Sequence, residues 1–360
     1  MVPEETTSPA ITHMNEEMGS AQISLSKRLL NWRTLVPLVI VLGFLIYTAS
    51  KLNINPGATW AAMRNANLAL FLAAFIVYYL SFLIRTVRWR LLLENVGYSR
   101  KGETPLPRFG SLLEILFTSW FANAVVPAKL GDVYRAYLLR QEAGVSATRT
   151  FGTVLAERLL DLSVLLVLFL AAVLVSLHEH LPSVLRAGLY VALAIVVLGV
   201  LALICLRLFN TQIRRFVPPR FQGYYDQLQV GTLGSFKRLH LLLPLTVIIW
   251  FCETGRFFFI ALSLNLLPGS LLHIGAVSML LALGEALLSA VPFTSGGIGP
   301  VESGMFIMLA LFTSARNLAA ASILLDRTIS LFSVLLIGLI VFLIGSGRRA
   351  TRKRDAIQKA

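Results

Sequence analysis

The chain has 360 residues, of which 56% are hydrophobic and 14% are charged, and its formal net charge is +14. Soluble globular domains are roughly 45–50% apolar, so this composition argues against a soluble enzyme or binding module. The basic residues lie between apolar runs, which favours anchoring at a membrane surface and argues against nucleic acid as a partner.

The first 33 residues are polar and are expected to form a disordered cytoplasmic tail. Six apolar runs follow, and several reach the roughly 20 residues that a helix needs to cross a bilayer. Continuous apolar runs without alternation indicate helices and not the strands of a barrel. The runs are Leu35–Tyr47, Leu68–Ile84, Leu162–Leu177, Leu189–Leu206, Leu241–Leu267 and Ile323–Ile344.

Two further apolar segments, at about residues 111–139 and 276–311, are each interrupted by proline and glycine. The interruptions are Val126–Gly131 and Val291–Pro300. Non-helical backbone at membrane depth survives only where it is buried in protein or lines a wet cavity. Each segment is therefore expected to be a re-entrant hairpin that enters and leaves on one side of the membrane.

Three patterns recur in the same order, at offsets of about 165–169 residues. The matched residues are Arg88 with Arg256, Pro127 with Pro292, and Glu157 with Asp326. This recurrence predicts two repeats, at about 68–177 and 239–346, separated by a connecting helix at 184–206 and a basic cytoplasmic loop at 207–238. The expected fold class is an all-α integral membrane protein with two inverted repeats, about six full spans and two hairpins, an architecture typical of transporters.

The positive-inside rule gives the expected orientation of the transmembrane domain, residues 34–346. With the N-terminus in the cytoplasm, the basic segments 85–108 and 207–238 and the basic tail 347–360 all lie in the cytoplasm of a plasma (inner) membrane. If both broken segments crossed the membrane fully, residues 129–149, with four basic side chains, would lie outside. The re-entrant arrangement is therefore preferred.

Charged residues occur in or beside apolar helices, where each costs roughly 2.5–3.5 kcal/mol on insertion scales. Such residues must form ion pairs or face a wet cavity. Glu253 and Arg256, three residues apart, can form a local ion pair. The adjacent residues Glu157-Arg158, and likewise Asp326-Arg327, point in different directions, so each is expected to pair across helices. The expected buried polar pathway is Glu157, Arg158, Asp161, Glu253, Glu285, Glu302, Asp326 and Arg327. Structural salt bridges that lock the repeats together are the alternative.

A second set of residues is expected to bind a lipid phosphate. A guanidinium grips phosphate through two parallel hydrogen bonds, and Arg88 recurs as Arg256. Glycine at a helix start, with basic residues beside it, forms an anion site from backbone N–H groups. The expected headgroup-binding residues are Arg88, Arg256, Lys129, Arg135, Asn123, Gly131, Gly296, Gly297 and Gly299. Interfacial anchoring and solvated surface charge are the alternatives for the basic members.

The chain shows no P-loop, no dinucleotide fingerprint and no metal-binding spacing. Its two cysteines, Cys205 and Cys252, both lie in apolar runs and are interpreted as small buried hydrophobes. No catalytic residue, metal or cofactor is therefore expected, and an ATP-driven pump is not favoured.

Several of these residues, in order, resemble a known family: Asn123–Leu139, Glu157-Arg158 with Asp161, Glu285, Pro292, Gly296-Gly297-Ile-Gly299 and Glu302. They are similar to the lysylphosphatidylglycerol synthase transmembrane-domain family, also called the flippase-like domain family, over roughly residues 30–345. The resemblance implies a lipid-handling membrane domain. Bifunctional members carry a large C-terminal synthase domain that this 360-residue chain lacks, so synthesis of lysylphosphatidylglycerol is not expected.

Three functions remain open on the sequence. The first is a flippase for a membrane phospholipid or a lipid-linked glycan, and the second is a membrane-embedded lipid-phosphate transferase. The third is a non-transporting scaffold subunit of a lipid or glycan pathway. A second copy of the chain and enzymes of such a pathway are the expected protein partners.

Overall fold

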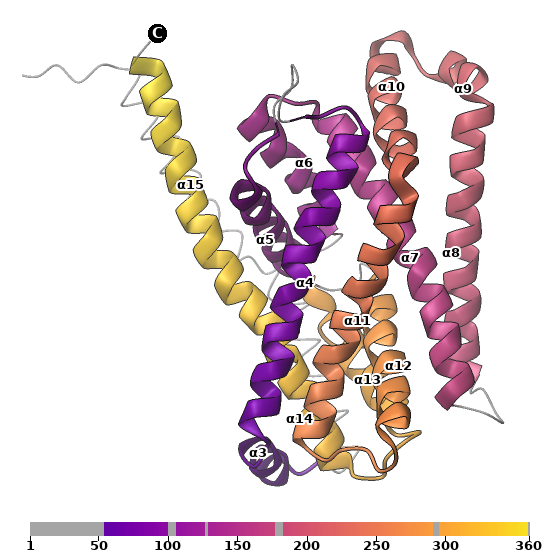
Figure 1. Ribbon diagram of the computed structural model, residues 1–360, viewed down its shortest axis with the longest axis vertical. Coiled ribbons are helices and arrows are strands. Elements are labelled where there is room, and N and C mark those ends of the chain that lie inside the picture. Colours follow the sequence, from indigo (N-terminus) through magenta and orange to yellow (C-terminus); the bar gives the residue numbers. More distant parts are fainter. Residues whose placement is uncertain (1–53, 100–105, 127–128, 177–182, 291–294, 359–360) are drawn as a thin grey trace, which may run out of the picture. The chain divides into compact units, whose positions relative to one another are not determined.

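The computed structural model describes residues 54–99, 106–126, 129–176, 183–290 and 295–358. Every regular element in these ranges is helical (Figure 1), which confirms the all-α class expected from the sequence. The elements are α3 (Pro56–Arg64), α4 (Leu68–Asn95), α5 (Phe109–Val125), α6 (Leu130–Ala143), α7 (Ala147–Ser176), α8 (Ser183–Leu208), α9 (Asn210–Phe216), α10 (Pro219–Gly234), η2 (Ser235–Arg238), α11 (Leu239–Ser263), α12 (Leu271–Ala290), η3 (Ser295–Gly297), α13 (Pro300–Leu309), α14 (Arg316–Arg327), the π-helical turn η4 (Thr328–Ser333) and α15 (Val334–Gln358).

Several of these helices have the length and composition of membrane spans. The four that qualify among the described residues are Leu68–Asn95, Pro219–Ser263, Leu271–Ser289 and Arg316–Gly345. The expected number was about six. The apolar run at 35–47 lies outside the described residues, and the run at 162–177 forms only the second half of α7, whose first half is charged. The protein is therefore a multi-pass membrane protein, with four of its spans identified by length and composition.

Helices α4 and α11 make the most extensive helix–helix contact in the described part of the chain. In lipid, association depends on close packing, and small residues allow it. At Gly255 of α11, an added Cβ would lie 3.2 Å from Cγ1 of Val77 on α4. Tyr78 of α4 and Phe257 of α11 are almost completely buried. Helices α5, α7, α12 and α14 each pack against one or both of these two helices.

The helices form two similar series, here called the first half (α4–α7) and the second half (α11–α15). Each has a long helix, two shorter helices with a break between them, and a final long helical segment. Pro127 and Pro292 lie in the breaks but outside the described residues. The backbone beside them has positive φ at Lys129 (52°) and at Gly297 (71°), positions 168 residues apart.

The segment 207–238 was expected to be a loop, and this was wrong. It forms α9, α10 and η2, and α10 packs closely on α7. Glycine on both helices makes the approach possible, because a Cβ at Gly231 would lie 2.1 Å from the carbonyl oxygen of Arg149. The basic tail expected at 347–360 is likewise helical as far as Gln358, at the end of α15.

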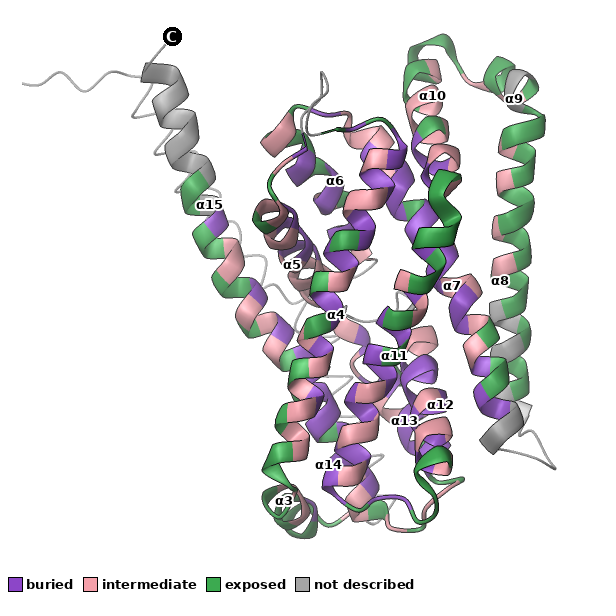
Figure 2. Ribbon diagram, in the orientation of Figure 1, coloured by how far each residue is buried: buried purple, intermediate pink, exposed green. Residues whose placement is uncertain are grey.

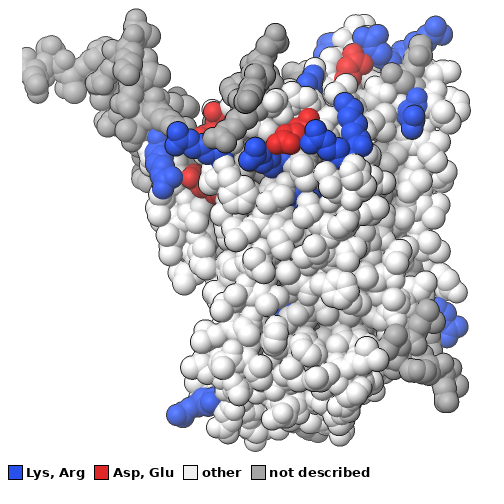
Figure 3. Space-filling model, in the orientation of Figure 1, with Lys and Arg blue, Asp and Glu red and all other residues white. Residues whose placement is uncertain are grey.

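Exposure and charge follow the pattern of a membrane protein. Helix α8 is exposed along most of its described length (Figure 2), and its exposed side chains include Leu193, Leu198 and Leu201. On the face drawn in Figure 3, Lys and Arg gather at the end of the molecule where α6, α9 and α10 lie. The wide band below them carries few charges. Apolar surface of this extent suits contact with lipid.

Candidate functional site

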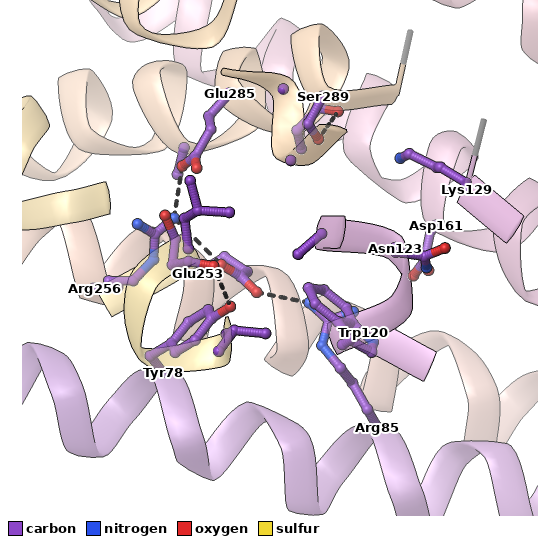
Figure 4. Close-up of a pocket in the computed structure, with 18 of the residues that line it drawn as sticks. Tyr78, Arg85, Trp120, Asn123, Lys129, Asp161, Glu253, Arg256, Glu285 and Ser289 are labelled. Atoms are coloured by element: carbon purple, nitrogen blue, oxygen red, sulfur yellow. Dashed lines mark hydrogen bonds and ion pairs between the residues drawn. The ribbon is translucent and has the colours of Figure 1, made fainter. Parts of the chain in front are cut away.

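A cavity of about 400 Å³ lies between the two halves. Its wall contains the aromatic side chains Tyr78, Trp120 and Trp250 and many charged ones. Figure 4 shows Lys129 and Asp161 on one side of this space and Arg256 on the other. The charged lining residues are Arg85, Lys129, Asp132, Arg158, Asp161, Glu253, Arg256, Glu285 and Arg327. Such a wall, set among apolar helices, suits a ligand with both polar and apolar parts.

Arg88 lies behind the wall of this cavity and not in it. Its side chain is 0% exposed. It donates to Asp161 at 2.5 and 3.0 Å, to Glu157 at 2.9 Å and to the Thr246 hydroxyl of α11 at 2.9 Å. Arg135 is the second cation on Glu157, at 3.0 Å, and it stacks 3.9 Å from the ring centre of Trp89. The structure thus uses both arginines in a buried network, and neither is among the residues that line the cavity.

The break of the first half is held by a second ion pair. Asp132, in the first turn of α6, accepts two hydrogen bonds of 2.8 Å from Arg158 of α7. Asn123 of α5 donates to the same carboxylate at 3.0 Å. Gly131 was expected to help bind an anion, but it lies where α5 and α6 meet. A Cβ there would be 2.1 Å from the carbonyl oxygen of Ser119, so this glycine serves close packing.

Arg256 is the centre of the network in the second half. It forms a close ion pair with Asp326, and it also contacts Glu285 at 2.7 Å and Glu253 at 3.4 Å. The expected local pair of Glu253 with Arg256 is confirmed. Asp326 is 0% exposed, whereas Glu253 and Glu285 line the cavity. The guanidinium of Arg256 therefore forms ion pairs with three carboxylates.

Arg327 holds the glycine-rich break of the second half. It bonds to Glu302 at 2.6 Å, to Glu285 at 3.3 Å and to the carbonyl oxygen of Gly296 at 2.6 Å. The other carboxylate oxygen of Glu302 accepts the backbone N–H of Gly299 at 2.5 Å and so caps α13. These contacts give Glu302 and Gly299 a structural role at the start of the helix, while Gly296 lines the cavity.

The ion pairs of the two halves correspond closely in sequence spacing. Arg88 with Glu157 corresponds to Arg256 with Asp326, at offsets of 168 and 169. Likewise, the pair of Arg158 with Asp132 corresponds to the pair of Arg327 with Glu302, at offsets of 169 and 170. The expectation that adjacent Glu-Arg and Asp-Arg residues pair across different helices is confirmed in both halves.

Arg85 is a cavity residue that sequence reasoning missed. Its place at the end of an apolar run is typical of an interfacial anchor, as is that of Arg90, which pairs with Glu94 at 3.0 Å near the surface. Arg85 is instead 4% exposed and contacts Glu253 of α11 at 2.7 Å. The two residues are 168 positions apart, so a full alignment of the repeats would have placed them at equivalent positions.

Comparison with known proteins shows what this chain is similar to. Residues 34–338 match the family model described as lysylphosphatidylglycerol synthase TM region. A UPF0104 membrane protein of Methanocaldococcus jannaschii is 31% identical over 62% of this chain and 94% of its own length. A second protein of that name and organism is 24% identical over 85% of this chain and 94% of its own length. Glycosyltransferase AglD of Haloferax volcanii is 25% identical over 78% of this chain but only 50% of its own length.

Proposed function

Because the chain belongs to the lysylphosphatidylglycerol synthase transmembrane region family, we propose that it is a lipid flippase. Its substrate would be an anionic or glycosylated membrane lipid, a class that includes polyprenyl-linked lipids. The observation that carries the proposal is the cavity of about 400 Å³, which both halves line with charged and aromatic side chains. A polar headgroup needs such an environment to pass the apolar interior of a bilayer.

The ion pairs that line the cavity support this function because their partners are shared. Glu285 accepts from both Arg256 and Arg327, and Glu253 accepts from both Arg85 and Arg256. A headgroup can displace one contact of such a group while another remains, so neither charge is left unpaired. Isolated pairs would have to break completely, which is far more costly in a low-dielectric interior.

We further propose that the two halves are inverted repeats. Figure 1 supports this view, because α5 and α6 lie toward one end of α4 and α12 and α13 toward its other end. Helices α5, α6 and α13 have 17, 14 and 10 residues, short of the roughly 20 of a full span, which favours re-entrant hairpins. Helix α12 has 20 residues and is long enough to cross.

The proposed setting is the plasma (inner) membrane, with both termini in the cytoplasm. The gathering of Lys and Arg at one end of the molecule (Figure 3) supports this orientation. Alternating access would then arise from rocking of one half against the other across the α4–α11 contact.

Reconstitution into liposomes tests the function. Fluorescent lipids in the inner leaflet become accessible to a membrane-impermeant quencher only if they cross the bilayer. We expect faster exchange than in protein-free vesicles for at least one anionic or glycosylated lipid, and a loss of roughly tenfold in Glu285→Gln. The matched control is Asp226→Asn, which alters an exposed carboxylate paired with Arg214 and should not change the rate. Exchange equal to that of empty vesicles for all such lipids would reject the proposal.

A second candidate is a membrane-embedded lipid-phosphate transferase or a scaffold subunit in a lipid or glycan pathway. The observation that favours it is the relative named a glycosyltransferase, although this chain spans half of that protein's length. A transferase would change the headgroup of a labelled lipid without leaflet exchange. A scaffold would do neither, and would instead co-purify with a second copy of the chain or with enzymes of the pathway.

A further inference from the structure

Lys129 is set apart from the arginines of the cavity by its lack of a partner. Arg85, Arg158, Arg256 and Arg327 each contact a carboxylate at 3.3 Å or less. Lys129 forms no ion pair or hydrogen bond with any residue that the structure describes. It is partly buried, and Figure 4 shows its side chain extending from the start of α6 into the cavity. An ammonium in this position leaves a positive charge for a ligand to neutralise.

The carboxylates that face Lys129 across the cavity wall are already occupied. Asp132 receives two bonds from Arg158 and one from Asn123. Asp161 receives two bonds from Arg88. Both carboxylates therefore have stronger, multiply bonded partners, and their charge is largely compensated.

The backbone at Lys129 supplies independent support. It has φ 52° and ψ 37°, the left-handed conformation, which is unfavourable for residues with a Cβ. The residue 168 positions later, Gly297, has φ 71° and is a glycine, the residue that adopts this conformation without strain. The break of the first half thus places a lysine in this conformation, whereas the described positive-φ residues at the break of the second half are glycines. Strained residues of this kind cluster at active sites and ligand-binding sites.

Other polar groups in the wall also lack a partner among the described residues. The indole nitrogen of Trp250 is buried and makes no hydrogen bond, and Trp250 is only 8% exposed. The Nε atom of Arg85, which is 4% exposed, is likewise unpartnered. Both residues line the same cavity as Lys129. Buried donors are normally satisfied, so unpartnered donors on two residues that line the cavity fit a site that a hydrogen-bond acceptor completes.

We propose that Lys129 binds the phosphate of the substrate lipid and selects headgroups that carry a net negative charge. This inference rests on the proposed lipid-handling function, and it reduces the set of basic residues expected to contact phosphate to one principal cation. A zwitterionic headgroup would bring its own cation next to Lys129 and would be disfavoured.

Ligand-dependent thermal unfolding in detergent tests this inference directly. The probes are lysophosphatidylglycerol, which is anionic, lysophosphatidylcholine, which is zwitterionic, and inorganic phosphate. We expect the anionic lysolipid alone to raise the Tm of the wild-type protein. The apparent affinity of the protein for the anionic lysolipid should fall roughly tenfold or more in Lys129→Gly and Lys129→Ala. The variant Lys129→Arg should retain the wild-type affinity.

Two comparisons separate binding from folding. Lys129→Gly removes both charge and strain, so without ligand it should be at least as stable as wild type, while Lys129→Ala keeps the strain. Asn265→Gly is the matched control, because Asn265 is the other described non-glycine residue with positive φ (47°) and does not line the cavity. It should leave the affinity for the anionic lysolipid unchanged.

Three outcomes would overturn the proposal. The first is equal affinity of Lys129→Gly and wild type for the anionic lysolipid, and the second is a rise in Tm with the zwitterionic lysolipid that equals the rise with the anionic one. The third is a rise in Tm with inorganic phosphate but with neither lysolipid. The last would assign the site to free phosphate. Lys129-dependent binding without leaflet exchange would refute the flippase and leave this site standing. If wild type and Lys129→Gly both exchange lipids without headgroup preference, the role proposed for Lys129 would be refuted. The proposed flippase function would then remain supported.

Discussion

The two halves share one plan of ion pairs but differ in charge balance. Around the cavity, the described cations of the first half are Arg88, Lys129, Arg135 and Arg158, against the carboxylates Asp132, Glu157 and Asp161. Those of the second half are Arg256 and Arg327, against Glu253, Glu285, Glu302 and Asp326. Arg85, from the first half, joins the two through Glu253.

This difference shows that similar helices can create unlike environments on the two sides of one cavity. The first half has one more cation than carboxylates in this set, and the second half has more carboxylates than arginines of its own. The same substitution should therefore have different effects in the two halves.

The largest effect is expected at the contact between the halves. Arg85→Glu would place a second buried carboxylate against Glu253. This change should destabilise the protein by at least about 5 kcal/mol, so little folded protein should be recovered. The double variant Arg85→Glu/Glu253→Arg reverses the pair and should regain much of the loss. Thermal unfolding and the yield of monodisperse protein in detergent measure both. If the double variant were no better than the single one, the pair would not be what joins the halves.

The next effect compares equivalent carboxylates. Glu157→Gln leaves the buried guanidinium of Arg135 without its ion-pair partner and should cost about 3–5 kcal/mol. Asp326→Asn removes one of the three carboxylates on Arg256, which keeps Glu285 and Glu253, and should cost only about 1 kcal/mol. Urea or thermal unfolding of the two variants under identical conditions provides the measurement. Equal losses would contradict the charge imbalance described above.

A smaller effect concerns the two breaks. Gly297→Ala adds a Cβ at φ 71° and only 2.7 Å from Cγ2 of Val301, and should cost about 1–2 kcal/mol or more. Lys129→Gly, in the break of the first half, should cost nothing or stabilise the protein. The difference in Tm between the two variants, measured without lipid ligand, tests whether strain is confined to the first half. A Tm for Gly297→Ala at the wild-type value would argue against it.

The smallest effect is expected outside the cavity. Arg90→Ala removes an ion pair with Glu94 near the surface, where Arg90 has a side-chain exposure of 36%. Exposed pairs contribute about 0.2–1 kcal/mol, so the Tm should change little. Lipid exchange should also stay at the wild-type rate. A large loss in either quantity would show that the surface ends of α4 matter as much as its buried turns.

Much of the candidate site was predictable from charge placement alone. A carboxylate or guanidinium inside an apolar helix is so costly that it must have a partner, which is why the pairing of Arg158 and Arg327 across helices was correctly expected. Arg85 was missed because a basic residue at the end of an apolar run has the same local pattern whether it is an interfacial anchor or a buried cation.

The roles of individual cations were harder to predict from the sequence. Arg88 and Lys129 were both expected to meet a phosphate, but Arg88 is enclosed by carboxylates from α7, whereas Lys129 stays open in the cavity. Which of two cations is neutralised depends on distances between helices that the sequence does not specify. The helical nature of 207–238 was missed for a related reason, because its glycine contact with α7 joins residues about 80 positions apart.

The sequence by itself determined that this chain is an all-helical membrane protein with paired charges at a spacing of about 168 residues, because apolar length and the cost of buried charge are local properties. Only the tertiary structure decided which cation stays unpaired, which glycines pack and which line the cavity, and how Arg85 meets Glu253. Those outcomes depend on how α4 and α11 bring the two halves together, and a pattern read along one chain does not contain that information.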